Sequence, residues 1–133
     1  MSLVPGFGWG LGLVMAGGAV GAGIRWCVGQ ALLRQMQSGF PWATLVVNLV
    51  GAFFAGWLLV RLEGHAQAAV LRPLLVVGLL GGLTTFSSLM VECLVLARSP
   101  QPTVALWYLG SSLVGGLLLV VLGARLATGS LTD

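Results

Sequence analysis

The feature that most constrains this chain is an apolar stretch of membrane-spanning length that is interrupted near its middle. The stretch from Leu71 to Leu96 is long and apolar enough to cross a bilayer as one helix. Inside it, residues 81–88 have the sequence GGLTTFSS. Glycine lowers helix propensity, and Ser and Thr hydroxyls compete for backbone hydrogen bonds. The pattern therefore predicts a break in this helix at membrane depth.

Two interpretations of such a break remain open. Irregular backbone at membrane depth is tolerated only where protein or water satisfies its polar groups, and in transporters such breaks bind ions. Alternatively, the small residues of this run allow another helix to pack closely against it. The same close approach is expected wherever small residues recur at a spacing of four: Gly8/Gly12, Gly17/Gly21 and Gly78/Gly82.

Composition extends the membrane assignment to the whole chain. Of its 133 residues, 58% are hydrophobic and 7% are charged, against about 25% charged in a soluble domain. We expect an all-α membrane protein with four transmembrane helices in a single integral membrane domain, residues 1–133. The predicted spans are about 11–33, 42–60, 71–96 and 104–126, with the third helix broken near its middle.

Two other classes of protein receive no support from the sequence. The six basic residues are arginines scattered singly along the chain, which is not the pattern of a nucleic-acid-binding surface. Paired acids, a Ser–His–Asp set and a phosphate-binding loop are all missing, so the sequence does not indicate an enzyme.

The arginines outside the spans divide almost evenly between the two sides of the membrane. The side that carries both termini and the middle connection has three of them: Arg61, Arg72 and Arg125. The other side has two: Arg34 and Arg98. Arg25 lies within the first span. Because arginine bias sets membrane orientation, this count predicts insertion in both orientations and an antiparallel, dual-topology homodimer.

Three polar residues at membrane depth require an explanation, because such groups are costly there. Arg25 is either a structural anchor or a pore residue; we favour the anchor, with a backbone carbonyl, Asn48 or Glu92 as its partner. Asn48, on one helical face with Thr44, either donates to a passing anion or bridges two helices. Glu92 is either a proton relay or a structural group paired with Arg25 or a hydroxyl, and we favour the structural role.

Two further groups of residues could contact an anion. Tyr108, Ser112 and Gly116 recur at a spacing of four and form a hydroxyl stripe on the fourth span. Phe86 and Leu89 lie about one turn apart just beyond the break. The positive edge of an aromatic ring can contact a small anion weakly, which suits conduction. The alternative is that these are ordinary hydrophobic residues facing lipid or another helix.

Taken together, these motifs resemble the CrcB/Fluc family of fluoride channels. Residues 81–89 resemble the third-helix signature of that family, and residues 18–26 resemble its first-helix glycine–arginine motif. Residues 48–53 resemble its second-helix asparagine motif, and the stripe from Tyr108 to Gly116 fits its fourth-helix track. The resemblance covers essentially the whole chain, with the motifs in order.

The resemblance implies an antiparallel homodimer with two pores in a bacterial-type inner membrane. Each pore would pass fluoride passively, exclude chloride and lower cytoplasmic fluoride. A structural Na⁺ is implied at the dimer interface, with the backbone carbonyls of Gly81 and Thr84 as ligands. The residues implied to line the pore are Asn48, Phe86, Tyr108 and Ser112, with Thr44, Thr85 and Ser88 as further members of the polar track.

One residue departs from the family pattern. Leu89 stands where the family has a second phenylalanine, so one aromatic edge per pore is missing. The departure implies either an altered rate or selectivity, or the need for a second, complementary homologue.

The size and helix pattern of the chain are also compatible with two other functions. A proton-coupled small multidrug exporter is also a dimer of four short helices, but such exporters carry their essential acid in the first helix. Here the first span has no acid and Glu92 lies in the third. A non-transporting assembly subunit held by glycine packing would show no ion flux.

Overall fold

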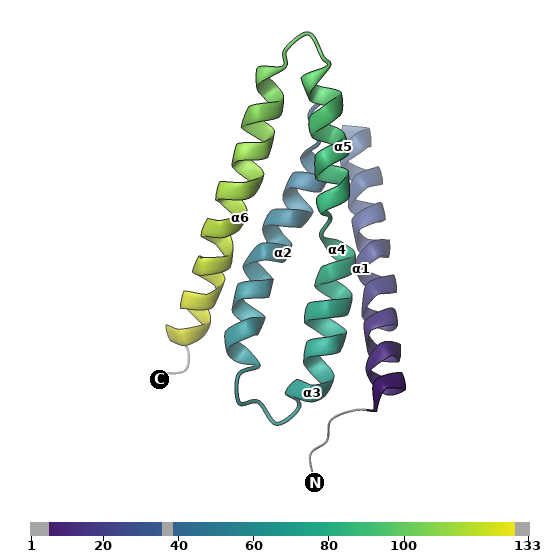
Figure 1. Cartoon of the computed structure of the whole chain (residues 1–133), viewed down its shortest axis with the longest axis vertical. Coiled ribbons are helices and arrows are strands. Elements are labelled where there is room, and N and C mark those ends of the chain that lie inside the picture. Colours follow the sequence, from purple (N-terminus) through teal and green to yellow (C-terminus); the bar gives the residue numbers. More distant parts are fainter. Residues whose placement is uncertain (1–5, 36–38, 130–133) are drawn as a thin grey trace.

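The computed structural model describes residues 6–35 and 39–129, and it is an up-and-down bundle of helices (Figure 1). Within these residues, four helical segments are long and apolar enough to cross a bilayer: Phe7–Leu32, Trp42–Arg61, Ala68–Ala97 and Thr103–Gly129. The predicted all-helical class and the four spans are confirmed. Each helix continues one to a few residues past the predicted limits at one or both ends, because backbone hydrogen bonding continues where hydropathy already falls.

The elements follow one another with short connections. The first two spans are α1 (Phe7–Gln35) and α2 (Trp42–Arg61), and the last is α6 (Thr103–Gly129). The third span consists of four consecutive pieces: α3 (Ala68–Leu71), the π-helix η1 (Arg72–Leu80), α4 (Gly81–Leu83) and α5 (Phe86–Ala97).

The interruption of the third span occupies two residues. Thr84 (φ −85°, ψ 156°) and Thr85 (φ −152°, ψ 123°) are extended, whereas Gly81 and Gly82 remain helical in α4. The break therefore falls within residues 81–88, as predicted, and at the two threonines of that run. The Thr85 hydroxyl accepts a hydrogen bond of 3.3 Å from the Ser88 amide and caps α5, so the threonines end one half-helix and begin the next.

Glycines bring α1 against the first half of the third span. A Cβ atom on Gly17 or Gly21 would overlap backbone atoms of η1 and α4, and one on Gly78 would lie 2.7 Å from the Val14 carbonyl oxygen. The close approach predicted for Gly17/Gly21 and Gly78/Gly82 is therefore confirmed. The close approach predicted at Gly8 and Gly12 is not seen, since a Cβ atom on either would meet nothing within 4 Å among the described residues.

A second glycine contact, between α2 and α6, was not predicted. A Cβ on Gly56 would overlap the carbonyl oxygen of Val120, and one on Gly123 would overlap that of Phe53. The signal was present in the sequence, because Ala52/Gly56 and Gly123/Ala127 also recur at a spacing of four.

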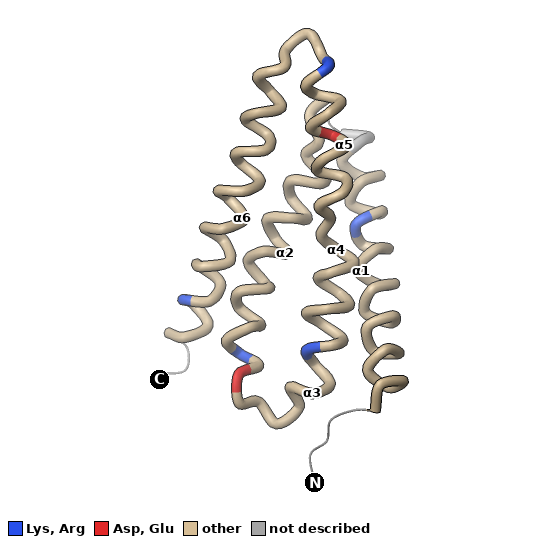
Figure 2. Tube along the Cα trace, in the orientation of Figure 1, with Lys and Arg blue, Asp and Glu red and all other residues tan. Residues whose placement is uncertain are grey.

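The break divides the third span between these two helix pairs. Its first half, η1 and α4, packs along α1, whereas α5 packs along α6. The start of α1, the end of α6 and the α2–α3 connection lie at one end of the bundle (Figure 1). Figure 2 shows sparse charges, with basic residues near both ends. The side chain of Arg34, one of the arginines in the predicted count, lies outside the described part.

Candidate ion-conducting site

Asn48, near the middle of α2, is bound to the interrupted backbone of the third span. Its amide nitrogen donates to the Thr85 carbonyl at 3.0 Å, and its amide oxygen accepts from the Thr85 N–H at 2.7 Å. Both polar groups of one extended peptide residue are satisfied by one side chain. Asn48 therefore bridges two helices, which was one of the two roles open to it.

The break changes the partners of the carbonyls that precede it. In a continuous helix, the N–H of Thr85 would reach the Gly81 carbonyl and that of Ser88 would reach the Thr84 carbonyl. Those two donors instead go to Asn48 and to the Thr85 hydroxyl. The Gly82 carbonyl accepts from Arg25 Nε at 3.1 Å. Gly81 and Thr84 thus present carbonyls that have lost their helical donors.

Arg25 on α1 reaches the same segment from the side. Its hydrogen bond to the Gly82 carbonyl makes a backbone carbonyl its partner, one of the three candidates considered for it. This contact joins α1 to the end of α4, directly before the break.

Glu92 on α5 forms the centre of a second polar group, inside the bundle. Its two carboxylate oxygens accept hydrogen bonds from the Thr44 hydroxyl at 2.7 Å and the Tyr108 hydroxyl at 2.6 Å. Tyr108 is fully buried, and the Ser112 hydroxyl donates to the Tyr108 carbonyl at 2.7 Å. Three helices, α2, α5 and α6, therefore meet at this carboxylate.

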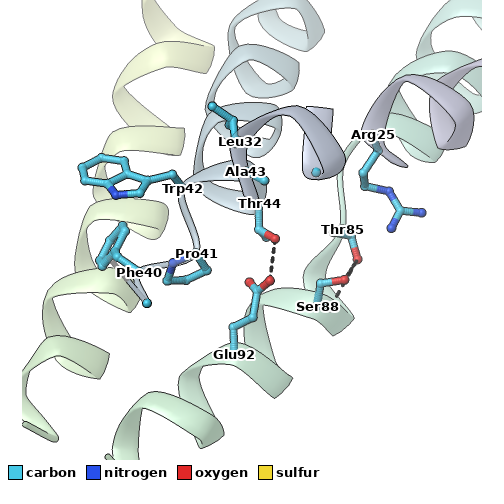
Figure 3. Close-up of a pocket in the computed structure, with 12 residues that line it drawn as sticks. Arg25, Leu32, Phe40, Pro41, Trp42, Ala43, Thr44, Thr85, Ser88 and Glu92 are labelled. Carbon is cyan, nitrogen blue, oxygen red and sulfur yellow. Dashed lines mark hydrogen bonds between the residues drawn. The ribbon is translucent and has the colours of Figure 1, made fainter. Parts of the chain in front are cut away.

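A cavity of about 480 Å³ joins the two polar groups. Figure 3 shows Arg25 on one side of it, Thr85 and Ser88 next, and Thr44 with Glu92 in the middle. The aromatic residues Phe40 and Trp42 lie on the side away from Arg25. The Arg25 guanidinium and the Ser88 hydroxyl offer donors for a small anion in this space, whereas the Thr44 hydroxyl already donates to Glu92, whose carboxylate also lines it.

A second cavity, of about 400 Å³, lies on the outer face at the break. Its wall includes Asn48, Gly81, Thr84, Phe86 and Leu89. The Phe86 ring points outward and is 68% exposed, whereas Leu89 is 4% exposed and packs with Leu45 and Tyr108.

The predicted site residues therefore fall into three places rather than one. Thr44, Glu92, Tyr108 and Ser112 form the interior group. Asn48, Thr85 and Ser88 surround the break, with the Gly81 and Thr84 carbonyls beside them. Phe86 lies on the outer face, where it lines the second cavity together with Asn48 and Thr84. A residue that the sequence did not indicate, Phe40, packs against Tyr108; its only signal is an aromatic side chain directly before Pro41.

Comparison with known proteins places these motifs in a family. The family model for "CrcB-like protein, Camphor Resistance (CrcB)" matches residues 12–124. A protein of Xylella fastidiosa (strain M23) named "Fluoride-specific ion channel FluC" is 55% identical over 115 residues, 86% of each chain.

More distant relatives have the same name. The protein of that name from Xanthomonas euvesicatoria is 54% identical over 85% of this chain and 86% of its own length. One from Thermus thermophilus is 46% identical over 86% of this chain and 90% of its own. The resemblance drawn from the sequence motifs is confirmed, and the chain belongs to the CrcB-like family of multi-pass integral membrane proteins.

Proposed function

We propose that this protein is a fluoride-selective ion channel that passively exports F⁻ and lowers cytoplasmic fluoride. The observation that carries the proposal is the cavity that joins the Glu92 group to the helix break and is lined in part by the Arg25 guanidinium and the Ser88 hydroxyl. The relatives named as fluoride-specific channels support it. Their names support neither an exporter nor a non-transporting subunit, and an ion channel is not an enzyme. Their bacterial sources favour the inner membrane.

The working unit is an antiparallel, dual-topology homodimer. Lipid-exposed irregular backbone does not occur in the hydrocarbon region, because its polar groups would be unsatisfied. Gly81, Phe86 and the cavity beside them face outward at the break. A second copy of the chain would cover this face and supply the other wall of each pore. The near-even arginine count supports opposite orientations for the two copies.

Phe86 then contacts fluoride from the interface, with Asn48, Thr85 and Ser88 beside the break and Thr44, Tyr108 and Ser112 deeper in the subunit. A positive ring edge gives a weak contact, and the Thr44, Tyr108 and Ser112 hydroxyls contact the ion only by exchanging their present acceptors, the Glu92 carboxylate and the Tyr108 carbonyl. Contacts of this kind allow an ion to enter and to leave. Leu89 is buried against Tyr108 in the subunit, so it contributes shape rather than an anion contact.

A structural Na⁺ fits the same face. The carbonyls of Gly81 and Thr84 have lost their helical donors to Asn48 and Thr85, and carbonyl oxygens are ligands for hard cations. A bound Na⁺ would supply a positive charge that holds these carbonyls in the dimer. The purified dimer should therefore unfold at a higher temperature in Na⁺ than in N-methylglucamine, since a ligand of the folded state stabilises it.

The test is ion efflux from liposomes that contain the purified protein. Fluoride should leave rapidly, and chloride, measured in parallel, should stay. Phe86→Ala should reduce fluoride efflux while the subunit stays folded, because the ring is 68% exposed within the subunit. A folded dimer that releases no fluoride would contradict the proposal, and unchanged efflux in Phe86→Ala would remove Phe86 from the pore.

A further inference from the structure

Phe40, in the connection between α1 and α2, stands in a wall that two cavities share. The larger is the 480 Å³ cavity that contains Thr44 and Glu92. The smaller, of about 280 Å³, lies between this connection and the one that joins α5 to α6, where Leu96, Ser99 and Gln101 line it. Gly39 and Phe40 border both spaces, and glycine has no side chain to separate them.

The position of the Phe40 ring is held by two other rings. It packs edge-to-face on Tyr108 with a centroid distance of 5.4 Å and an interplanar angle of 82°. Its centroid also lies 4.6 Å from that of Trp42. Pro41 follows directly and restricts the backbone conformation of Phe40. A half-buried side chain with these contacts has a defined place in the wall.

The two spaces differ in what lies behind the ring. On the inner side, the fully buried Tyr108 donates a hydrogen bond to Glu92. On the outer side are residues of the α5–α6 connection, of which Pro100 and Gln101 are exposed. Water that passed the ring would approach the Glu92 group without meeting Ser88 or Thr85.

We propose that Phe40 is a specificity-determining residue of the channel. Its ring closes a second water route between the α5–α6 end of the bundle and the Glu92 group, so that ions enter only through the larger cavity. A selective pathway requires that every ion pass the same contacts, and a parallel route would let other anions avoid them. The selectivity part of this proposal rests on the proposed channel function, whereas the barrier part does not.

The experiment measures access of water-soluble reagent to Cys93, which packs on the same cluster of Leu45, Leu89 and Tyr108 as Phe40. Cys27, the other cysteine, is exposed on α1 and is removed as Cys27→Ala. In detergent, where both ends of the bundle are accessible, modification by a charged methanethiosulfonate reagent is followed over time. Phe40→Ala should speed it about tenfold, equivalent to lowering the entry barrier by about 1.4 kcal/mol.

A size series keeps the test independent of one variant. The rate should rise in the order Trp, Phe, Leu, Val and Ala at position 40, so Phe40→Trp and Phe40→Leu remain informative if Phe40→Ala fails to fold. Trp107→Ala is the matched control, because Trp107 is an aromatic residue near the same end but is 78% exposed. Its rate should equal that of the parent.

Folded variants whose modification rate does not depend on the size of residue 40 would overturn the barrier. So would a Trp107→Ala rate as high as that of Phe40→Ala. In liposomes, Phe40→Ala should also release chloride, which the parent retains, and continued retention would overturn the selectivity role. Failure of the channel function itself would be seen separately, as a parent that passes no fluoride.

Discussion

Asn48 and Glu92 are both polar residues at membrane depth, yet they satisfy different partners. Asn48 supplies a donor and an acceptor to one extended residue, Thr85, whose peptide groups have no helical partners. Glu92 accepts from two hydroxyls, on Thr44 and Tyr108, and so joins three helices through side chains alone. Among the described side chains, no buried nitrogen or oxygen lacks a hydrogen-bond partner.

The first prediction concerns Asn48. Asn48→Ala removes both hydrogen bonds to Thr85 and leaves an amide and a carbonyl unsatisfied at the break. We expect the free energy of unfolding to fall by about 1–3 kcal/mol and fluoride efflux to fall with it. Unfolding in mild detergent measures the first effect and liposome efflux the second.

Ser111→Ala is the control for this substitution. Ser111 donates only to the Tyr108 carbonyl of its own helix, so its loss should change the free energy of unfolding by less than about 0.5 kcal/mol. Equal losses in the two variants would argue against the bridging role of Asn48.

The second prediction concerns the Glu92 group. In a double-mutant cycle of Tyr108→Phe with Glu92→Gln, we expect a coupling energy of about 0.5–3 kcal/mol, because one hydrogen bond joins the two side chains directly. The same cycle with Ser111→Ala in place of Tyr108→Phe should give a coupling near zero. A coupling of zero in the first cycle would mean that the hydrogen bond does not stabilise the fold.

At the scale of elements, the two halves of the third span pack against different helices, the first against α1 and the second against α6. The glycines of η1 and α4 allow contact with α1, while α5 is free to pack on α6 because Thr84 and Thr85 are extended. The close-packing interpretation of the small residues and the break interpretation therefore hold at different residues. Gly82 serves the contact with α1, and the threonines open the backbone.

The third prediction tests the contact between α2 and α6. A Cβ on Gly56 would overlap the Val120 carbonyl, and neither backbone can move without separating the helices. Gly56→Ala should therefore destabilise the protein by about 3 kcal/mol or more. The measurement is the unfolding midpoint of the purified protein.

Gly110→Ala provides the matched substitution on α6. A Cβ there would meet nothing within 4 Å, so alanine should be neutral or stabilise the helix by up to about 1 kcal/mol. If both glycine variants behave alike, close packing does not hold α2 to α6.

At the scale of the whole molecule, the distribution of charge and the exposed break both concern how the chain is oriented and paired in the membrane. Basic residues near both ends leave no strong preference for either orientation. In the proposed dimer, the second copy covers the outward cavity at Gly81 and Phe86, where lipid would leave backbone groups unsatisfied. A dimer of oppositely oriented copies meets both conditions.

The fourth prediction concerns this dual topology. His65 lies exposed in the α2–α3 connection and Gln101 in the α5–α6 connection, at opposite ends. With both native cysteines replaced, His65→Cys and Gln101→Cys should each be labelled by an impermeant maleimide in about half of the copies in intact cells. Labelling of nearly all copies at one site and almost none at the other would show a single orientation.

The sequence alone determined the properties that depend on neighbouring residues. Hydropathy located the four spans, the small-residue spacing located the contact of Gly17 and Gly21, and residues 81–88 located the break to within a few positions. Each of these signals is local, because helix formation and transfer into lipid depend on a window of about 20 residues.

Only the tertiary structure decided which groups meet. The pairing of Asn48 with Thr85, the placing of Tyr108 inside and Phe86 outside, and the packing of Phe40 on Tyr108 depend on how each helix is rotated about its axis. That rotation is set by backbone contacts between helices, such as Gly56 with Val120. The α1 and α6 sequences have no strongly one-sided apolar face, since lipid and protein neighbours are both apolar, and so hydropathy cannot define the rotation.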